Sequence, residues 1–159
     1  MTDTKNIFIS HVHEDDALLP GLKQLIARAG MEVRDGSINS DKPNNAENEE
    51  YIKREILKPR IEWASTLVVL ITHDTAQSWW VNWEIKYAAQ IGKRVIGVFA
   101  QGATDADIPE ELRKYGDAAP VGWQGNRVVD AINGNTDWDD PQTGQPRNPE
   151  WEIKRVSCE

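Results

Sequence analysis

The chain has 159 residues and a mass of 18.0 kDa, which is enough for one domain with a hydrophobic core and too little to favour two domains. Its formal net charge of −8 argues against partners such as nucleic acid or an anionic membrane surface, because both attract basic proteins. The single cysteine, Cys158, excludes a disulfide framework and a cysteine metal cluster, and it fits a reducing, cytoplasmic setting.

The N-terminal part of the chain predicts a strand, a helix and a second strand. Residues 6–10 form a short apolar run that is too short for a signal peptide, and residues 14–30 then switch to helical periodicity. We expect Asp15 or Asp16 to cap this helix at its N-terminus. Residues 31–34 predict the second strand. No run in the sequence approaches the length of a membrane span.

A long polar segment separates the second strand from the best strand in the sequence. Residues 35–48 are rich in Gly, Ser, Asn, Asp and Pro, which predicts a loop, and loops of this length in compact domains are often functional. The periodicity of residues 49–61 predicts a helix whose length is limited by Pro59. Residues 66–72 are an almost uninterrupted apolar run, which is typical of a central parallel strand that is covered on both faces.

The segment SWWVNWEI, residues 78–85, predicts the first turns of a helix with Ser78 as its N-cap. Glu84 lies within the apolar stripe of this helix, and no side chain three or four residues away from it is a cation. Burial of an unpaired carboxylate is costly, so two interpretations stay open. Glu84 either sits at the rim and reaches water or a distant arginine, or it faces a crevice and stabilises a developing cation. The stripe consists of Trp80, Trp83, Tyr87, Ala88 and Ile91.

The last part of the sequence continues the alternation of strands and helices. The predicted elements are a strand at 94–100, a short helix at 108–116, a last strand at 118–123 and a last helix at 126–133. This order predicts an α/β protein with a flavodoxin-like three-layer fold, in which helices cover both faces of a central, mostly parallel five-stranded sheet.

The predicted domain comprises residues 1–133, and a polar extension follows at 134–159. The extension is rich in Pro and Gly, and its large aromatic side chains are Trp138 and Trp151. It is either disordered or pinned to the domain by these tryptophans, and we expect it to pack back at least in part.

In an open parallel sheet, ligands bind beyond the carboxyl ends of the strands, so the residues that follow each strand are candidates for a site. The sequence lacks the glycine-rich phosphate-binding motifs and the H-E-x-x-H motif. Glu14, Asp15, Asp16 and Asp74 resemble the acidic cluster of a phosphoacceptor receiver domain. No lysine follows the last predicted strand, so we interpret these acids as partners of a helix N-terminus.

The residues that follow the first strand include potential metal ligands. His11 and His13, together with Glu14 or Asp15, offer ligand types that zinc accepts. The only other histidine is His73, and nothing else in the sequence completes a ligand set, so we expect no metal. His11 directly follows the strand, and we expect it to line the crevice.

Four features together resemble a Toll/interleukin receptor (TIR) domain, most closely the TIR-like proteins of bacterial Thoeris anti-phage systems. They are IFISH at 7–11, the long loop after the second strand, EILKPRIEWASTLVVLIT at 55–72 and SWWVNWE at 78–84. The resemblance covers residues 6–133 and does not include the C-terminal extension. It implies the flavodoxin-like TIR fold for the domain.

The resemblance also implies an activity. Enzymatic members of the TIR family cleave the nicotinamide N-glycosidic bond of NAD, and the glutamate of a W-x-x-x-E pattern is their catalytic residue. In this sequence the pattern maps to Glu84, with Trp80 as the aromatic wall of the site. Ser10 and His11 match the family segment at the end of the first strand and would bind the ribose or phosphate side of NAD. NAD would be the substrate, and no cofactor is implied.

By the same resemblance, the product would be an ADP-ribose-derived signal, most consistent with a cyclic form, that activates a separate effector in anti-phage defence. Self-association is expected to support activity. The alternative is a non-catalytic TIR module that works by homotypic assembly, with the loop at 35–48 as a docking surface. Many members carry an aromatic and a basic residue where this chain has His11, Val12 and His13, so the acceptor of the ribosyl group stays open.

Overall fold

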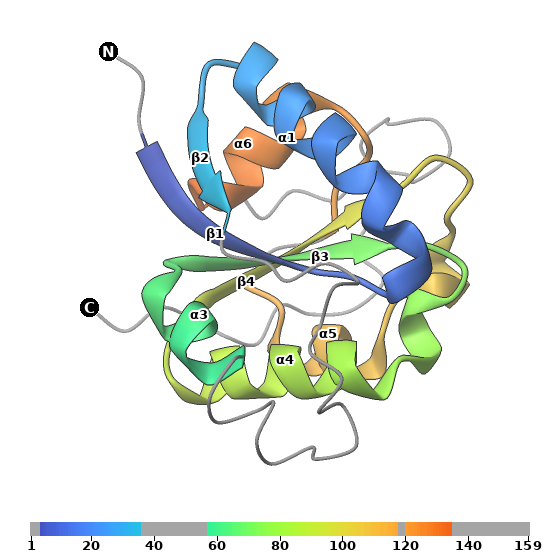
Figure 1. Cartoon of the computed structure of the whole chain (residues 1–159). Helices are drawn as coiled ribbons and strands as arrows, with labels where there is room; N and C mark the ends of the chain where they lie inside the picture. The colour runs from blue at the N-terminus through green and yellow to red at the C-terminus, as the bar shows by residue number, and fades with distance from the viewer. Residues whose placement is uncertain (1–3, 36–56, 118–119, 135–159) are drawn as a thin grey trace.

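The computed structural model describes residues 4–35, 57–117 and 120–134. Within these ranges the chain forms a three-layer α/β fold around a four-stranded sheet with the order β2-β1-β3-β4, and each neighbouring pair of strands is parallel (Figure 1). The predicted fold class is confirmed. The strands are β1 (Thr4–Ser10), β2 (Glu32–Asp35), β3 (Thr66–Ile71) and β4 (Arg94–Phe99).

Helices cover both faces of the sheet. Figure 1 shows α1 and α6 on one face and α3, α4 and α5 on the other, and the contacts within each layer agree with this arrangement. None of the described helices is both long enough and apolar enough to cross a bilayer. The α-helices are α1 (Leu19–Arg28), α3 (Lys58–Trp63), α4 (Trp79–Gln90), α5 (Glu110–Tyr115) and α6 (Gly125–Ile132), and the 3₁₀ turns are η1 (His13–Leu18), η4 (Thr75–Gln77) and η5 (Asp105–Asp107).

The core consists of two apolar clusters, one on each face of the sheet. Successive side chains of a strand point to opposite faces, so Phe8 of β1 belongs to the cluster under α4, whereas Ile7 and Ile9 belong to the cluster under α1 and α6. All six residues of β3 are buried. The prediction of a central strand covered on both faces is confirmed.

The predicted fifth strand is reduced to a single bridge. Val121 lies parallel to Val98 of β4, with hydrogen bonds from the Phe99 amide to the Val121 carbonyl at 2.7 Å and from the Val121 amide to the Gly97 carbonyl at 3.0 Å. Pro120 precedes this bridge and has no amide hydrogen to donate, which disfavours a longer ladder. Two residues of the predicted strand, at 118–119, lie outside the described residues.

The start of the first helix differs from the prediction. A 3₁₀ turn comes first and α1 begins only at Leu19, because Pro20 fits the first turn of an α-helix but not its interior. The N-cap is Leu18, which makes no side-chain capping bond, so the expected cap by Asp15 is wrong. The Asp15 carboxylate instead accepts a hydrogen bond from the Thr72 hydroxyl. The Asp16 side chain lies outside the described residues.

The helix before the central strand also differs. Its described part begins at Lys58 and continues to Trp63, with Pro59 in the first turn rather than at the end. A proline in the first turn removes an amide hydrogen that would have no helical partner there, so it does not stop the helix. Residues 36–56, which include nearly all of the predicted loop, and 135–159, which form nearly all of the extension, lie outside the described residues.

The close approach of α1 and α6 predicts a stability defect for Gly125→Ala. A Cβ atom at Gly125 would collide with the carbonyl oxygen of Leu25 and lie 3.1 Å from Cβ of Ala29. We expect the free energy of unfolding to fall by about 1–3 kcal/mol, measured by urea denaturation. The control is Gly21→Ala in α1, where the new Cβ meets only Trp123 at 3.7 Å and should not destabilise the protein. Equal stability of both variants would contradict this packing.

The contact between α3 and α4 predicts a pH effect at Tyr87. Burial, and then the hydrogen bond to Glu62 at 2.6 Å, raise the pKa of Tyr87 from 10.0 to about 12. Because the folded state favours the neutral phenol, the resulting stabilisation is complete below about pH 10 and is lost as the pH rises towards 12. Glu62→Gln should move the ionisation to lower pH. Tyrosinate absorbance measures this, with Tyr87→Phe identifying the signal; a Tyr87 signal near pH 10 in the unmodified protein would contradict it.

Candidate active site

Helix α4 is held firmly at its N-terminus. The hydroxyl of Ser78 accepts a hydrogen bond from the Val81 amide at 3.2 Å, so the predicted N-cap is confirmed. The side chain of Asn82 donates to the Ser78 carbonyl at 2.9 Å and to the Ala76 carbonyl at 3.2 Å. Its amide oxygen also accepts from the amide of Glu111 in α5 at 3.3 Å. These bonds fix the position of the helix relative to the turn before it and to its neighbour.

Glu84 lies on the inner face of α4. The side chains buried against the sheet are those of Val81, Glu84, Ile85 and Ala88, whereas the three aromatic residues of the predicted stripe are only partly buried. Ile91, predicted to belong to the stripe, is exposed. The apolar face is therefore offset from the prediction, because the smaller side chains pack against the strands and the indole rings lie along the flank.

The carboxylate of Glu84 is buried and hydrogen bonded to the sheet. Glu84 is 4% exposed, and its Oε1 accepts a hydrogen bond of 2.6 Å from the hydroxyl of Ser10, which is 0% exposed. The length is typical of a bond between a hydroxyl and an ionised carboxylate. The interpretation in which Glu84 reaches bulk water at the rim of the helix is wrong. The distant arginine and the role of the carboxylate in stabilising a developing cation stay predictions.

Ser10 owes its position to the sheet. It is the last residue of β1 and pairs with Val69 in the adjacent strand β3. Phe8 and Val12, two residues before and after it, pack in the cluster beneath α4, so the same alternation directs Ser10 towards that helix. The structure thus brings together Ser10 and Glu84, two of the residues that the sequence predicted for the site.

His11 follows Ser10 and is also buried. Its Nδ1 lies 3.0 Å from the carbonyl oxygen of Ile9. A carbonyl can only accept a hydrogen bond, so Nδ1 of His11 is the donor in this contact. This bond holds the ring against its own strand at the end of β1, and the expectation that His11 lines a ligand crevice stays a prediction.

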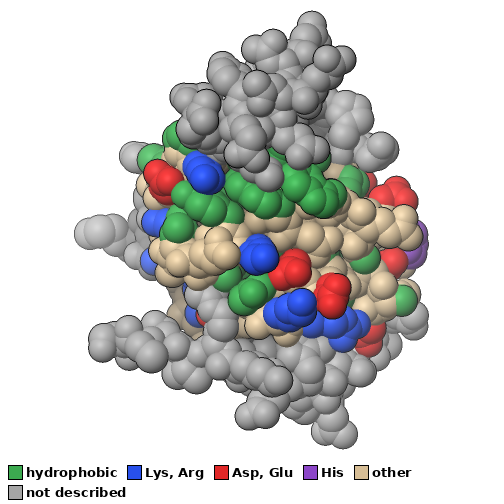
Figure 2. Space-filling model, turned by 90° about the horizontal axis from the view of Figure 1, so that it is seen from below, with side chains coloured by type: hydrophobic (Ala, Val, Ile, Leu, Met, Phe, Trp, Pro, Cys, Tyr) green, Lys and Arg blue, Asp and Glu red, His purple; other side chains and the backbone are tan. Residues whose placement is uncertain are grey.

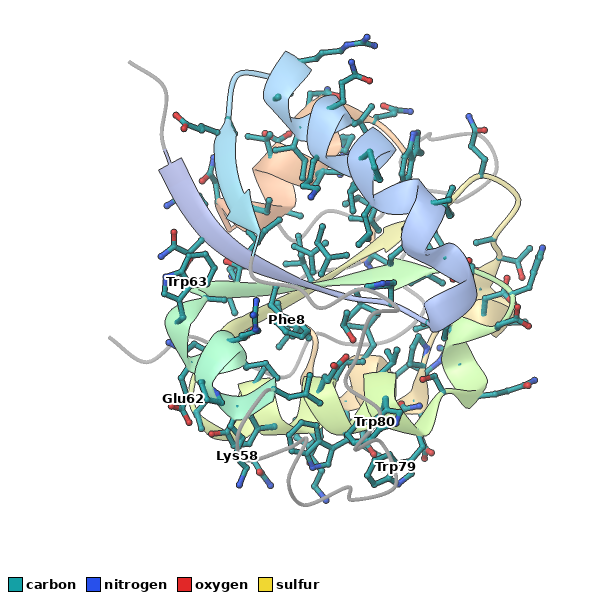
Figure 3. All side chains as sticks on the ribbon, in the orientation of Figure 1. Phe8, Lys58, Glu62, Trp63, Trp79 and Trp80 are labelled. Atoms are coloured by element: carbon teal, nitrogen blue, oxygen red, sulfur yellow. The ribbon has the colours of Figure 1, made fainter. Side chains whose placement is uncertain are left out.

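Trp80 is part of a row of aromatic side chains on α4. Its ring centroid lies 4.8 Å from that of Trp79 and 6.3 Å from that of Trp83, both in edge-to-face geometry. Trp83 in turn stacks on Tyr87 at 5.4 Å. Figure 3 labels Trp79 and Trp80 on this helix, and Figure 2, which views the molecule from the side of α4, shows hydrophobic side chains gathered in a band. Trp80 is four residues before Glu84, so the two residues lie about one helical turn apart on α4.

A network at the carboxyl end of β3 was not predicted. The Thr72 hydroxyl donates to Asp15 at 2.6 Å, the Thr72 amide donates to the Thr75 hydroxyl at 2.8 Å, and Thr75 donates to the Leu70 carbonyl at 3.0 Å. It ties the turn after β1 to the end of β3. The only signal in the sequence was a threonine at the end of an apolar run. Over the described ranges, no group of three His, Cys, Asp or Glu side chains is placed to hold a metal ion.

Comparisons with known proteins identify the family of the chain. A family model described as "Thoeris protein ThsB, TIR-like domain" matches residues 8–105, which is more than half of the chain and includes Ser10 and Glu84. A curated relative from Cytobacillus dafuensis, named "Putative cyclic ADP-D-ribose synthase TIR2", is 28% identical over 89 residues. The match covers 55% of this chain and 23% of that relative. By the match to the family model, the chain belongs to the TIR-like domain family of the Thoeris protein ThsB.

Proposed function

We propose that this protein cleaves NAD between nicotinamide and ribose and that Glu84 is the catalytic residue. The observation that carries the proposal is the buried carboxylate of Glu84, held by Ser10 beside the tryptophans of α4. The similarity to a protein named as a cyclic ADP-D-ribose synthase supports the same substrate.

The chemistry requires a single carboxylate. In NAD the nicotinamide ring is already cationic, so it leaves with the electron pair of the N-glycosidic bond and needs no general acid. The ribosyl carbon then acquires oxocarbenium character, as in glycoside hydrolysis. A carboxylate that is withdrawn from water interacts strongly with such a developing positive charge. Glu84, at 4% exposed, meets this condition.

Trp80 and His11 complete the proposed site. The partly buried indole of Trp80 offers an aromatic surface for the planar, cationic nicotinamide ring before the bond breaks. His11 directly follows β1, at the strand end where the ribose or phosphates of NAD would bind in this proposal. NAD is the substrate in this proposal, and no cofactor takes part.

The similarity to a protein named as a putative cyclic ADP-D-ribose synthase supports a cyclic product. Hydrolysis needs a water molecule beside the ribosyl carbon, and a site that excludes water disfavours this reaction. An atom of the same ADP-ribose moiety is then the better placed nucleophile. This atom forms a bond to the ribosyl carbon in place of the bond to nicotinamide. Where the atom carries a proton, it releases that proton, and the product is a cyclic form of ADP-ribose. We propose that this product is a signal for a separate effector in anti-phage defence and that the enzyme acts in the cytoplasm.

Self-association belongs to the same proposal. Trp63 and Trp79 are 44% and 49% exposed and lie on the helical layer formed by α3 and α4 (Figure 3). Large exposed aromatic side chains are frequent at protein interfaces. They also favour the alternative function, a TIR module that assembles without catalysis, which differs from the enzyme in releasing no nicotinamide.

Glu84→Gln should abolish NAD cleavage without loss of the fold. Glutamine has nearly the same shape and can still accept the hydrogen bond from Ser10, but it lacks the charge that stabilises the ribosyl centre. We expect nicotinamide release to fall by about 10³-fold. Chromatography of NAD reactions at several protein concentrations measures this release, and thermal unfolding checks the fold. The matched control is Glu62→Gln, which neutralises an exposed glutamate and should keep full activity.

The mass of the adenine-containing product separates the outcomes of the same experiment. A cyclic product has the mass of NAD less nicotinamide, whereas ADP-ribose is heavier by one water molecule. Full activity in Glu84→Gln would overturn the catalytic assignment. Concentration-dependent light scattering with no nicotinamide release at any concentration would instead favour the assembly module.

A further inference from the structure

We infer that Ser10 is a positioning residue that acts through Glu84, and that its hydroxyl holds the catalytic carboxylate in its reactive orientation. This inference rests on the proposed function and assigns Ser10 a role other than the direct substrate contact that the family resemblance implies. It is carried by the hydrogen bond of 2.6 Å between Ser10 Oγ and Glu84 Oε1.

The two partners come from rigid parts of the fold that are 74 residues apart in the sequence. Ser10 is anchored in the ladder between β1 and β3, where it pairs with Val69. Glu84 lies in the middle of α4, whose start is fixed by the Ser78 cap and by Asn82. A donor and an acceptor held by separate rigid elements define one orientation of the carboxylate.

Burial distinguishes a positioning role from a substrate contact. Ser10 is 0% exposed, and its hydroxyl has one proton, which it donates to Glu84. A ribose or phosphate group would therefore have to break this bond in order to accept that proton. The glutamate side chain has several rotatable bonds, and the reaction needs one orientation of its carboxylate. An intact hydrogen bond from Ser10 maintains that orientation.

The loss of the hydroxyl should change kcat and leave KM nearly constant. In Ser10→Ala we expect kcat for nicotinamide release to fall about 10- to 100-fold, with KM within about 2-fold, because a small misplacement of a catalytic group has an effect of this size. Ser10→Thr keeps a hydroxyl and should restore most of the rate. Ser65→Ala is the matched control, because it removes an exposed serine hydroxyl bond at the opposite end of the sheet and should not alter activity.

Two kinetic results would overturn the inference. Wild-type kcat in Ser10→Ala would show that the hydroxyl is dispensable, and a change confined to KM would indicate a direct substrate contact. A double-mutant cycle adds a stricter criterion. If Ser10 acts through Glu84, Ser10→Ala causes no further loss in the Glu84→Gln background, whereas multiplied losses would reveal an independent role.

A structural measurement tests the inference without relying on activity. Crystal structures of the unmodified protein and of Ser10→Ala should show Glu84 in one conformer in the former and displaced or in several conformers in the latter. An unchanged single conformer would overturn the positioning role. If the unmodified protein releases no nicotinamide, the proposed function fails, and the crystal structures still decide whether Ser10 orients Glu84.

Discussion

The burial of one carboxylate constrains the rest of this structure. An ionised glutamate inside an α/β core is tolerated only when polar groups satisfy it, and the hydroxyl of Ser10 supplies such a group from the sheet. That requirement fixes which residue of β1 faces α4. A shift of one residue along β1 would turn Ser10 to the other face and place Ile9 or His11 beneath Glu84. The register of the sheet and the polarity of the site are thus coupled.

The residue at which helix α4 begins matters as much for the position of Glu84 as the register of strand β1. A helix that began one residue later would rotate by about 100°, and Glu84 would leave the sheet. Ser78 and Asn82 prevent this through hydrogen bonds to the first turn, to the preceding turn and to α5. The indole of Trp80 lies on the flank because the space against the strands is taken by smaller side chains. The placement of the aromatic row along the flank and that of the carboxylate against the sheet are therefore two consequences of one helix start.

Local patterns predicted the elements better than the contacts between them. The apolar run of β3 and the Ser78 cap are encoded within a few residues, and both predictions are confirmed. The Glu84–Ser10 hydrogen bond joins residues far apart in the sequence, so no local sequence pattern predicts it. The start of α1 was missed because capping acids suggested an early start, whereas the position of Pro20 decides where α-helical bonding begins. The fifth strand was overestimated because apolar composition does not reveal how many residues pair.

The fold by itself does not select the reaction, since open parallel sheets with the same layers serve many chemistries. A receiver domain places several acids at this edge of the sheet to bind a metal ion, and here Asp15 instead accepts the hydroxyl of Thr72. A glycosidase with a neutral leaving group requires a second carboxyl group as an acid. A cationic leaving group removes that requirement, and one carboxylate is then sufficient. A buried glutamate that accepts a hydrogen bond from a neutral hydroxyl is compatible with the proposed cleavage of a pyridinium glycoside.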